Sequence, residues 1–435
     1  MAHLDCLHPF APSEVEGPSR ALPRVPGLGF ARRDVSTSSQ RDEVYPERLP
    51  WQAVEGLDMN GLSGSTAQES LALYVHWPFC VSKCPYCDFN SHVREQVDQD
   101  QWREALLADL AYEAAQLPGR RLTSIFFGGG TPSLMPPSTV EALLAAAEKH
   151  WGFADGIETT LEANPSSVEA ARFADLARAG VNRVSLGLQS LDDTALRFLG
   201  RAHDVNEGLM ALGTAQSVFG RVSFDLIYAL PGQSSEAWAA ELDRALSFGT
   251  GHLSLYQLTI EPGTRFAALA AKGELIPADP DESAALYELT QEKTAGAGLP
   301  AYEISNHARP GEESRHNLAY WRYGTYAGIG PGAHGRRGGV ATQRHRKPEN
   351  WQDALARNGH GIVEEVAIAP GEQRIEALLM GLRLAEGIPF APEGLDLAAV
   401  DRLIAQGLLE RTPERLRATP RGMLLLDGIL AQIVN

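Results

Sequence analysis

A regular alternation of strand and helix patterns constrains the fold of this chain more than any other feature. Six apolar runs of strand length lie at residues 71–77, 122–127, 157–162, 183–189, 222–228 and 252–258. Each precedes a helical pattern, at residues 102–117, 138–151, 168–179, up to 219, 236–248 and 281–297. Successive β–α units indicate a parallel sheet with right-handed crossovers. Because a closed barrel needs more units, a partial barrel and an open doubly wound sheet both fit the pattern.

The chain divides into four segments by composition and pattern. The first 70 residues are rich in Pro, Gly and Ser and lack sustained periodicity, which predicts a disordered N-terminal extension. A mitochondrial transit peptide, or a start codon assigned upstream of a true start at Met59, would give a similar composition. The other segments are the expected barrel at 71–300, a linker region at 301–370 and a small C-terminal α+β unit at 371–435.

The pattern of the C-terminal unit resembles a winged helix. Two helical segments precede a short strand and a further helix. Winged helices invite a DNA-binding interpretation. Residues 371–435 nevertheless hold seven Lys and Arg against nine Asp and Glu, so the basic footprint of a nucleic-acid-binding surface is missing. We therefore expect this unit to be a lid or docking domain.

Overall charge and cysteine content exclude several classes of protein. The net charge of −17 disfavours nucleic acid as a partner, because such binding needs cations to neutralise phosphates. No apolar run is long enough for a transmembrane segment, which leaves peripheral membrane association open. Four cysteines in 435 residues are too few for a disulfide scaffold. These features favour a cytoplasmic protein in a reducing environment.

Each of the six predicted strands carries a polar residue after it, at its end or, for Asp225, within it. These residues comprise the cysteines after the first strand, a Gly-Gly-Gly-Thr-Pro run after the second, then Glu162, Gln189, Asp225 and Gln257. The carboxyl ends of parallel strands meet at one edge of the sheet, which is where ligands bind in such folds. Six successive polar positions therefore predict one shared site at that edge.

Three cysteines form a Cys-x3-Cys-x2-Cys cluster at Cys80, Cys84 and Cys87. Thiolates are soft ligands that suit iron–sulfur clusters or zinc. Structural zinc usually takes four protein ligands, and only His76 and His92 lie nearby as a fourth. Three thiolates can hold a four-iron cluster whose remaining iron stays open to another ligand. We therefore favour an iron–sulfur cluster over zinc.

At this point the sequence resembles the radical S-adenosylmethionine superfamily, through the cysteine spacing and the aromatic Tyr86 before the third cysteine. The runs YVHWPFCVSKCPYCDFNSH, GGGTPS, LEANP, GVNRVSLGLQS, GRAH and FDLIYALPGQ are similar to its HemN/HemW branch. The resemblance covers the chain from residue 71 onward. It implies a partial (β/α)6 barrel that binds a [4Fe–4S] cluster and S-adenosylmethionine.

The resemblance also implies site residues. The cluster ligands would be Cys80, Cys84 and Cys87. The S-adenosylmethionine contacts would be Tyr74, Tyr86, Gly129, Gly130, Thr131, Glu162, Gln189, Arg201 and Asp225. From the residues alone, Glu162 and Asp225 could equally pair with Arg201 as ion pairs, and Tyr74 could be a core aromatic.

A second motif, Arg315-His-Asn-Leu-Ala-Tyr-Trp321, resembles the HNxxYW motif that is implicated in haem binding in HemW proteins. It implies haem contacts at His316, Asn317, Tyr320 and Trp321, and we expect the motif to form a surface of its own. His334 and His203 are further candidate ligands, because imidazole is a common axial ligand of haem iron. A packed interdomain linker is the alternative interpretation.

The position of Phe89 separates two functions within this branch. HemN-type cluster motifs continue to a fourth cysteine at the position that Phe89 occupies here. The resemblance therefore implies a haem chaperone that delivers haem to acceptor apoproteins without coproporphyrinogen oxidase turnover, and it leaves a homodimer open. The alternative is an oxygen-independent coproporphyrinogen III oxidase. A radical enzyme that modifies RNA is disfavoured by the negative charge.

Overall fold

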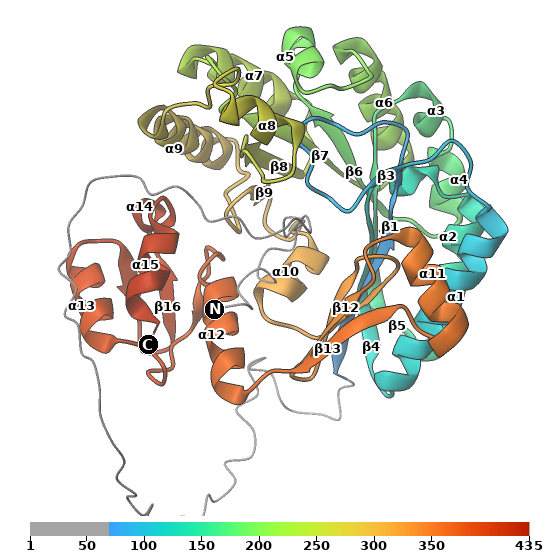
Figure 1. Ribbon diagram of the computed structural model, residues 1–435. Coiled ribbons are helices and arrows are strands. Elements are labelled where there is room, and N and C mark those ends of the chain that lie inside the picture. The colour runs from blue at the N-terminus through green and yellow to red at the C-terminus, as the bar shows by residue number, and fades with distance from the viewer. Residues whose placement is uncertain (1–68, 435) are drawn as a thin grey trace, which may run out of the picture. The chain divides into compact units, whose positions relative to one another are not determined.

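The computed structural model describes residues 69–434 and contains one large mixed sheet. Six of its strands are those predicted from the sequence, and each runs parallel to the next: β1 (Ser70–Trp77), β4 (Arg121–Gly129), β5 (Phe153–Ala163), β6 (Arg183–Gln189), β7 (Arg221–Tyr228) and β8 (His252–Gln257). They lie in that order across the sheet (Figure 1). The partial barrel expected from the sequence is confirmed. The predictions for the N-terminal extension and Met59 concern residues outside the described part of the chain.

Helices follow each of these six strands, and those after the first five strands connect each strand to the next along one face of the sheet (Figure 1). They are α1 (Gln99–Gln116), α2 (Pro137–Trp151), α3 (Ser167–Ala170), α4 (Phe173–Arg178), α5 (Asp193–Phe198), α6 (Val205–Val218), α7 (Ser235–Ser247), α8 (Arg265–Ala271) and α9 (Pro280–Gly296). Short polar side chains mark where many of them begin. Asp98, Ser234 and Asp279 each accept a hydrogen bond from a backbone N–H of the first turn, which satisfies a donor that the helix leaves free.

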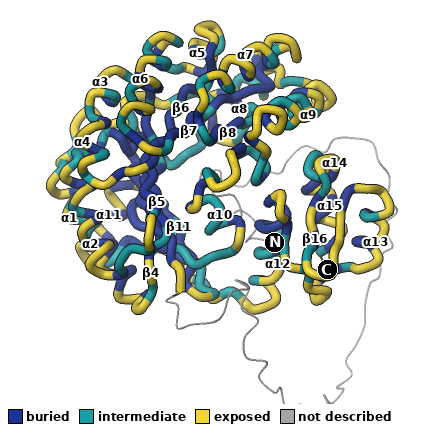
Figure 2. Tube along the Cα trace, turned by 180° about the vertical axis from the view of Figure 1, so that it is seen from behind, coloured by how far each residue is buried: buried dark blue, intermediate teal, exposed yellow. Residues whose placement is uncertain are grey.

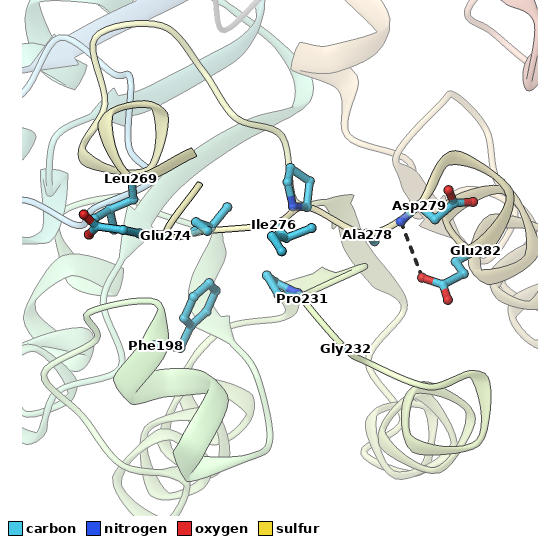
Figure 3. Close-up of a pocket in the computed structure, with 11 residues that line it drawn as sticks. Phe198, Pro231, Gly232, Leu269, Glu274, Ile276, Ala278, Asp279 and Glu282 are labelled. Atoms are coloured by element: carbon cyan, nitrogen blue, oxygen red, sulfur yellow. Dashed lines mark hydrogen bonds between the residues drawn. The ribbon is translucent and has the colours of Figure 1, made fainter. Parts of the chain in front are cut away.

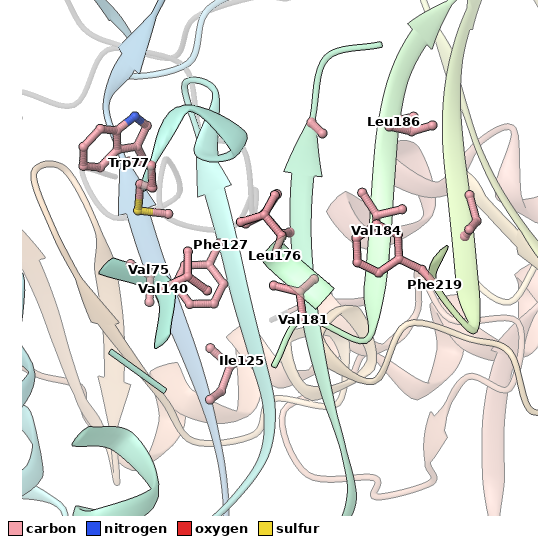
Figure 4. Packing of buried hydrophobic residues seen from close by; sticks show 14 of the residues in the cluster. Val75, Trp77, Ile125, Phe127, Val140, Leu176, Val181, Val184, Leu186 and Phe219 are labelled. Atoms are coloured by element: carbon pink, nitrogen blue, oxygen red, sulfur yellow. The ribbon is translucent and has the colours of Figure 1, made fainter. Parts of the chain in front are cut away.

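The core lies between the parallel strands and these helices. In β1, Leu71, Leu73 and Val75 are at most 1% exposed and face the helices, as the strand period of two requires. Val75, Phe127 and Val140 pack together in this layer (Figure 4). The strands are buried while the helices expose their outer sides (Figure 2). The other face of the sheet carries polar and aromatic side chains and is therefore available for a site.

The segment 301–370, expected as a linker region, contributes strands to the same sheet. Strand β9 (Asn306–Ala308) pairs antiparallel with β8, and β10 (Tyr326–Ile329) pairs parallel with β1. An antiparallel run of β11 (His334–Arg337), β12 (Val340–Arg344) and β13 (Ile362–Ala367) follows from β10. Helices α10 (Arg315–Trp321) and α11 (Pro348–Asn358) belong to the same segment. These residues extend the barrel sheet at both edges.

The chain ends in a small α+β unit with its own apolar cluster, as the sequence predicted. Its elements are α12 (Pro370–Gly381), β14 (Ile388–Pro389), α13 (Leu397–Ala405), β15 (Leu409–Arg411), β16 (Arg415–Ala418), α14 (Pro420–Met423) and α15 (Leu426–Ile433). The strands form an antiparallel sheet in the order β14-β16-β15. Across residues 69–434, none of the helices combines the length and apolarity needed to cross a membrane.

Candidate functional site at the carboxyl edge of the barrel

The loop after β1 carries the three cysteines. Cys80 ends the short strand β2 (Phe79–Cys80), which pairs with β3 (His92–Val93), and the N–H of Cys87 donates to the carbonyl of Cys84 at 3.2 Å. All three are free thiols of intermediate exposure. Burial raises the pKa of Cys80, and it raises the pKa of Cys87 to about 11. A bound metal reverses this preference, because only the thiolate is a ligand.

Two side chains from other loops donate hydrogen bonds to these sulfurs. The Thr131 hydroxyl lies 3.5 Å from Cys80 Sγ, and Arg201 Nη1 lies 3.5 Å from Cys84 Sγ. Asn164 bridges the two donors, with Nδ2 3.1 Å from Thr131 Oγ1 and Oδ1 2.6 Å from Arg201 Nη2. The cysteine loop is therefore tied to the loops that follow β4, β5 and α5.

These three thiols fit a four-iron cluster in their chemistry. In residues 69–434, no three His, Cys, Asp or Glu side chains are grouped as around a single metal ion. Each cysteine of a [4Fe–4S] cluster binds a different iron, so the thiolates need not converge on one point. The three sulfurs come from one loop, and those of Cys80 and Cys84 each accept a hydrogen bond. This environment suits such a cluster, because hydrogen bonds stabilise coordinating thiolates.

The glycine loop after β4 lies directly against the cysteine loop. Gly130 N donates to Trp77 O at 2.7 Å, and a Cβ at Gly130 would come within 2.7 Å of the carbonyl oxygen of Phe79. Gly129 has φ +112, in the left-handed region that favours glycine, and a Cβ there would meet the His76 ring at 2.6 Å. Glycine is therefore required at both positions for the two loops to pack.

Two carboxylates face the same edge from β5 and β7, the strands on either side of β6. Glu162 on β5 accepts a hydrogen bond from Gly129 N at 3.3 Å, and Asp225 on β7 accepts one from Ser185 Oγ at 3.1 Å. Burial, with the charge of Asp225, raises the pKa of Glu162 to about 8. Burial raises the pKa of Asp225 to about 6. A ligand that brings positive charge or hydroxyl donors would favour the ionised form of both groups.

The remaining positions implied for S-adenosylmethionine lie around the same edge. Tyr74 on β1 is hydrogen-bonded through its hydroxyl to His76 Nδ1 at 3.0 Å, and Tyr86 directly precedes Cys87 in the cysteine loop. Gln189 ends β6 with φ +69, a left-handed conformation that costs a non-glycine residue about 1 kcal/mol. The structure thus gathers all nine positions at one edge of the sheet, while their roles stay predictions.

The HNxxYW segment does not form the separate surface expected from the sequence. It is helix α10, and its His316 is 2% exposed, with Nδ1 3.1 Å from Ser124 Oγ and Nε2 3.1 Å from the Tyr320 hydroxyl. The imidazole stacks on Phe126 at a centroid distance of 5.0 Å. Burial lowers the pKa of His316 to about 3. His316 therefore covers the inner face of the sheet and is not presented to solvent.

The other motif residues have partners of their own. Asn317 Nδ2 donates to the Tyr302 hydroxyl at 3.3 Å. Trp321 is 6% exposed and clusters with Met380 and Leu384 of the C-terminal unit. Helix α10 therefore packs one side on the barrel and another on the C-terminal unit, so the four motif residues do not share one open surface.

The two further candidate histidines are also held by burial. Burial lowers the pKa of His334 on β11 to about 4, with Arg346 and Arg344 adding to the effect. His203 is 7% exposed and its Nε2 lies 3.2 Å from the carbonyl oxygen of Leu188. Burial also lowers the pKa of His203 to about 4. Both imidazoles are neutral at physiological pH, which suits metal ligation, but neither is freely accessible.

A pocket of about 560 Å³ lies apart from these residues. Phe198, Pro231 and Ile276 face one another across it (Figure 3), and acidic side chains including Glu282 lie at its rim. None of the positions implied for the cluster, the nucleotide or haem lines it. The candidate site is therefore defined by the residues at the strand ends and not by this pocket.

Comparison with known proteins agrees with this arrangement. The model of the radical SAM superfamily matches residues 74–245, and that of the HemN C-terminal domain matches residues 368–425. The solved structure of coproporphyrinogen III oxidase (HemN) from Escherichia coli superposes with a TM-score of 0.72 over 84% of this chain and 90% of that chain. At 22% sequence identity, this similarity shows the fold.

Curated relatives decide the family. The Escherichia coli protein named "Heme chaperone HemW" is 38% identical over 378 residues, which cover 83% of this chain and 97% of that protein. The chain belongs to the HemW family. A mouse relative of this HemW-family protein, "Radical S-adenosyl methionine domain-containing protein 1, mitochondrial", is 41% identical over 86% of this chain and 89% of its own length.

Asn164 and Glu169 are site residues that the sequence analysis did not single out. Asn164 bridges Thr131 and Arg201, and Glu169 accepts a hydrogen bond from Asn164 N at 2.9 Å. The available signal was position, since the LEANP run continues past the end of a strand at the ligand-binding edge. The sequence could not show which loops the side chain of Asn164 joins.

Proposed function

We propose that this HemW-family protein is a haem chaperone, which binds haem and passes it to acceptor apoproteins. The observation that carries the proposal is the similarity to "Heme chaperone HemW" proteins along most of both chains, as with the Escherichia coli protein at 38% identity. A second, from Mycobacterium tuberculosis, is 35% identical over 87% of this chain and 98% of its own length. Similarity of this extent includes both the barrel and the C-terminal unit.

Cys80, Cys84 and Cys87 would hold a [4Fe–4S] cluster beside an S-adenosylmethionine pocket. A reduced cluster of this type supplies an electron for cleavage of the bound sulfonium. The chain's own groups do the rest: the glycine loop offers close backbone approach, and Glu162 and Asp225 offer oxygen acceptors within hydrogen-bonded frames. Free thiols of this kind fit a reducing compartment, for which we propose the cytoplasm.

The second candidate function is oxidative decarboxylation of coproporphyrinogen III, which the fold similarity to HemN suggests. Against it, Phe89 occupies the position at which HemN-type motifs carry a fourth cysteine. The similarity in fold at 22% identity does not extend to substrate. The haem chaperone therefore remains the better supported function.

Haem binding by the α10 motif would require movement. We keep His316, Asn317, Tyr320 and Trp321 as the proposed haem contacts. Because His316 Nε2 is already hydrogen-bonded to Tyr320 and buried, ligation of iron by this atom requires α10 to separate from the inner face of the sheet. Haem loading should therefore be slower than diffusion and should depend on how tightly α10 is packed.

Haem titration of the reconstituted protein tests the proposal. We expect about one haem per chain in wild type and in a Cys80, Cys84 and Cys87 to Ala variant, with transfer to an apo-haemoprotein. His316→Ala should weaken or shift the haem absorbance, while His150→Ala, an exposed histidine on α2, should not. Unchanged haem binding by His316→Ala, together with wild-type turnover of coproporphyrinogen III, would establish the second candidate.

A further inference from the structure

Asn164 occupies the centre of a chain of hydrogen bonds that begins and ends on cysteine sulfurs. The chain runs from Cys80 through Thr131, Asn164 and Arg201 to Cys84, with successive distances of 3.5, 3.1, 2.6 and 3.5 Å. Its three inner members come from loops that are far apart in the sequence. One amide side chain therefore connects the hydrogen-bond donors of two different sulfurs.

The chemistry of Arg201 fixes the direction of every bond in the chain. A guanidinium only donates, so the Asn164 atom beside Arg201 Nη2 must be the carbonyl Oδ1. The amide Nδ2 therefore faces Thr131 and donates to its hydroxyl oxygen. The hydroxyl of Thr131 is then an acceptor on that side, and its single proton is free to point at Cys80 Sγ.

We propose that Asn164 is a positioning residue, which orients Thr131 and Arg201 so that the sulfurs of Cys80 and Cys84 each receive a hydrogen bond. The inference rests on the proposed cluster. Hydrogen bonds to coordinating thiolates stabilise the additional negative charge of the reduced cluster and raise its reduction potential. Asn164 thus contributes to the potential without touching the cysteines.

The frame that holds Asn164 does not involve the cysteines. Its backbone N–H donates to Glu169 Oε2 at 2.9 Å, and the same carboxylate accepts from Ser133 Oγ. Glu169 is 5% exposed. Arg201 is held independently by a hydrogen bond from Nη2 to the carbonyl of Gly187 at 2.9 Å. A change in the side chain of Asn164 should therefore alter the chain of hydrogen bonds between the two sulfurs. It should leave the bonds from Asn164 N to Glu169 and from Arg201 to Gly187 in place.

Asn164→Asp is the direct test, because the two side chains have the same shape. The carboxylate still accepts from Arg201 but cannot donate to Thr131. It accepts the Thr131 proton instead and turns that proton away from Cys80. After anaerobic reconstitution, we expect unchanged iron and sulfide content, a lower midpoint potential and a shifted electron paramagnetic resonance spectrum of the reduced cluster. An unchanged potential would contradict the inference.

The negative charge that Asn164→Asp adds lowers the potential by itself, so the Thr131→Val background provides the control. Without a hydroxyl to turn, Asn164→Asp should shift the potential less there than in wild type. Equal shifts in midpoint potential in the two backgrounds would show that Asn164 does not act through the Thr131 hydroxyl. Thr131→Val should lower the potential and Thr131→Ser should keep it, a comparison that stands even if Asn164→Asp fails to fold. Wild type that takes up no iron would overturn the proposed cluster and this inference with it.

Discussion

Buried acidic residues at the carboxyl edge of the barrel have pKa values that are set by their protein surroundings. Burial and the charge of Asp225 raise the pKa of Glu162 to about 8, against the opposing hydrogen bond from Gly129 N. Burial, followed by the charge of Glu162, raises the pKa of Tyr74. In the free protein, the folded state therefore binds a proton at Glu162 more tightly than the unfolded chain does.

Glu162→Gln should make stability less dependent on pH. A carboxyl group whose pKa is raised on folding stabilises the protein below about pH 4.5, and that contribution is lost as pH rises through about 8. Between pH 5 and 8.5, wild type should lose on the order of 4 kcal/mol more of its free energy of unfolding than the variant. Urea titrations at several pH values measure this, with exposed Glu148→Gln as the control. Parallel pH profiles for all three proteins would contradict it.

Candidate site residues could be predicted from the sequence where residue type and position alone suggest a role. The three cysteines and the polar strand ends carry their chemistry in the sequence, and the structure gathers them at one edge. The link that Asn164 makes between Thr131 and Arg201 could not be predicted. An amide side chain can donate and accept hydrogen bonds, and the sequence does not show which partners it meets.

Helix α10 shows that a sequence can predict which residues share a helix face without predicting what that face contacts. His316 and Tyr320 are four residues apart and so share one face, but the sequence does not say what that face meets. In the structure it meets Ser124 and Phe126 of β4, and the carboxylate of Glu158 accepts hydrogen bonds from the first backbone amides of α10. The expectation of an independent surface was wrong because a polar, aromatic helix can cover a polar sheet face.

His316→Ala should therefore destabilise the fold as well as affect haem. The change removes a ring packed on Phe126 and leaves Ser124 Oγ and the Tyr320 hydroxyl without their partner. We expect a loss of about 1–3 kcal/mol in the free energy of unfolding. His150→Ala should stay within about 0.5 kcal/mol of wild type. Equal stabilities in urea titrations of the two haem-free variants would show that α10 packs loosely.

The strands after α10 were missed for a different physical reason. Strands β10 and β11 are four residues each and contain Gly328 and Gly335, so they offer no run of alternating side chains. A Cβ at Gly328 would lie 1.8 Å from the carbonyl oxygen of His334, which shows that the backbones there approach too closely for a side chain. Their order is set by the pairing of β10 with β1, a contact between distant parts of the chain.

At the scale of the whole molecule, one buried carboxylate joins the barrel to its sheet extension. Asp109 on α1 is fully buried and accepts hydrogen bonds from Arg344 Nε at 2.6 Å, Trp351 Nε1 at 3.1 Å and Gly330 N at 3.0 Å. Glu113, one turn later, accepts from Arg344 Nη2 at 2.8 Å. Asp109 and Glu113 lie on the buried side of α1, where apolar residues are expected. The sheet extension supplies the hydrogen-bond donors that make burial of these two carboxylates possible.

Arg344→Met should destabilise the protein because it leaves both acids buried without this cation. Breaking a buried ion pair on one side typically costs about 3–5 kcal/mol, whereas an exposed pair contributes about 0–1 kcal/mol. The control is Arg94→Met, since Arg94 and Glu349 form a pair with side chains 44% and 61% exposed. Urea titration gives the free energies, and hydrogen exchange should show β10 to β13 losing protection before β4 to β7. If the two variants were equally stable, Asp109 would be held by the backbone amides and Trp351, Glu113 by Arg337, and Arg344 would be dispensable to the attachment.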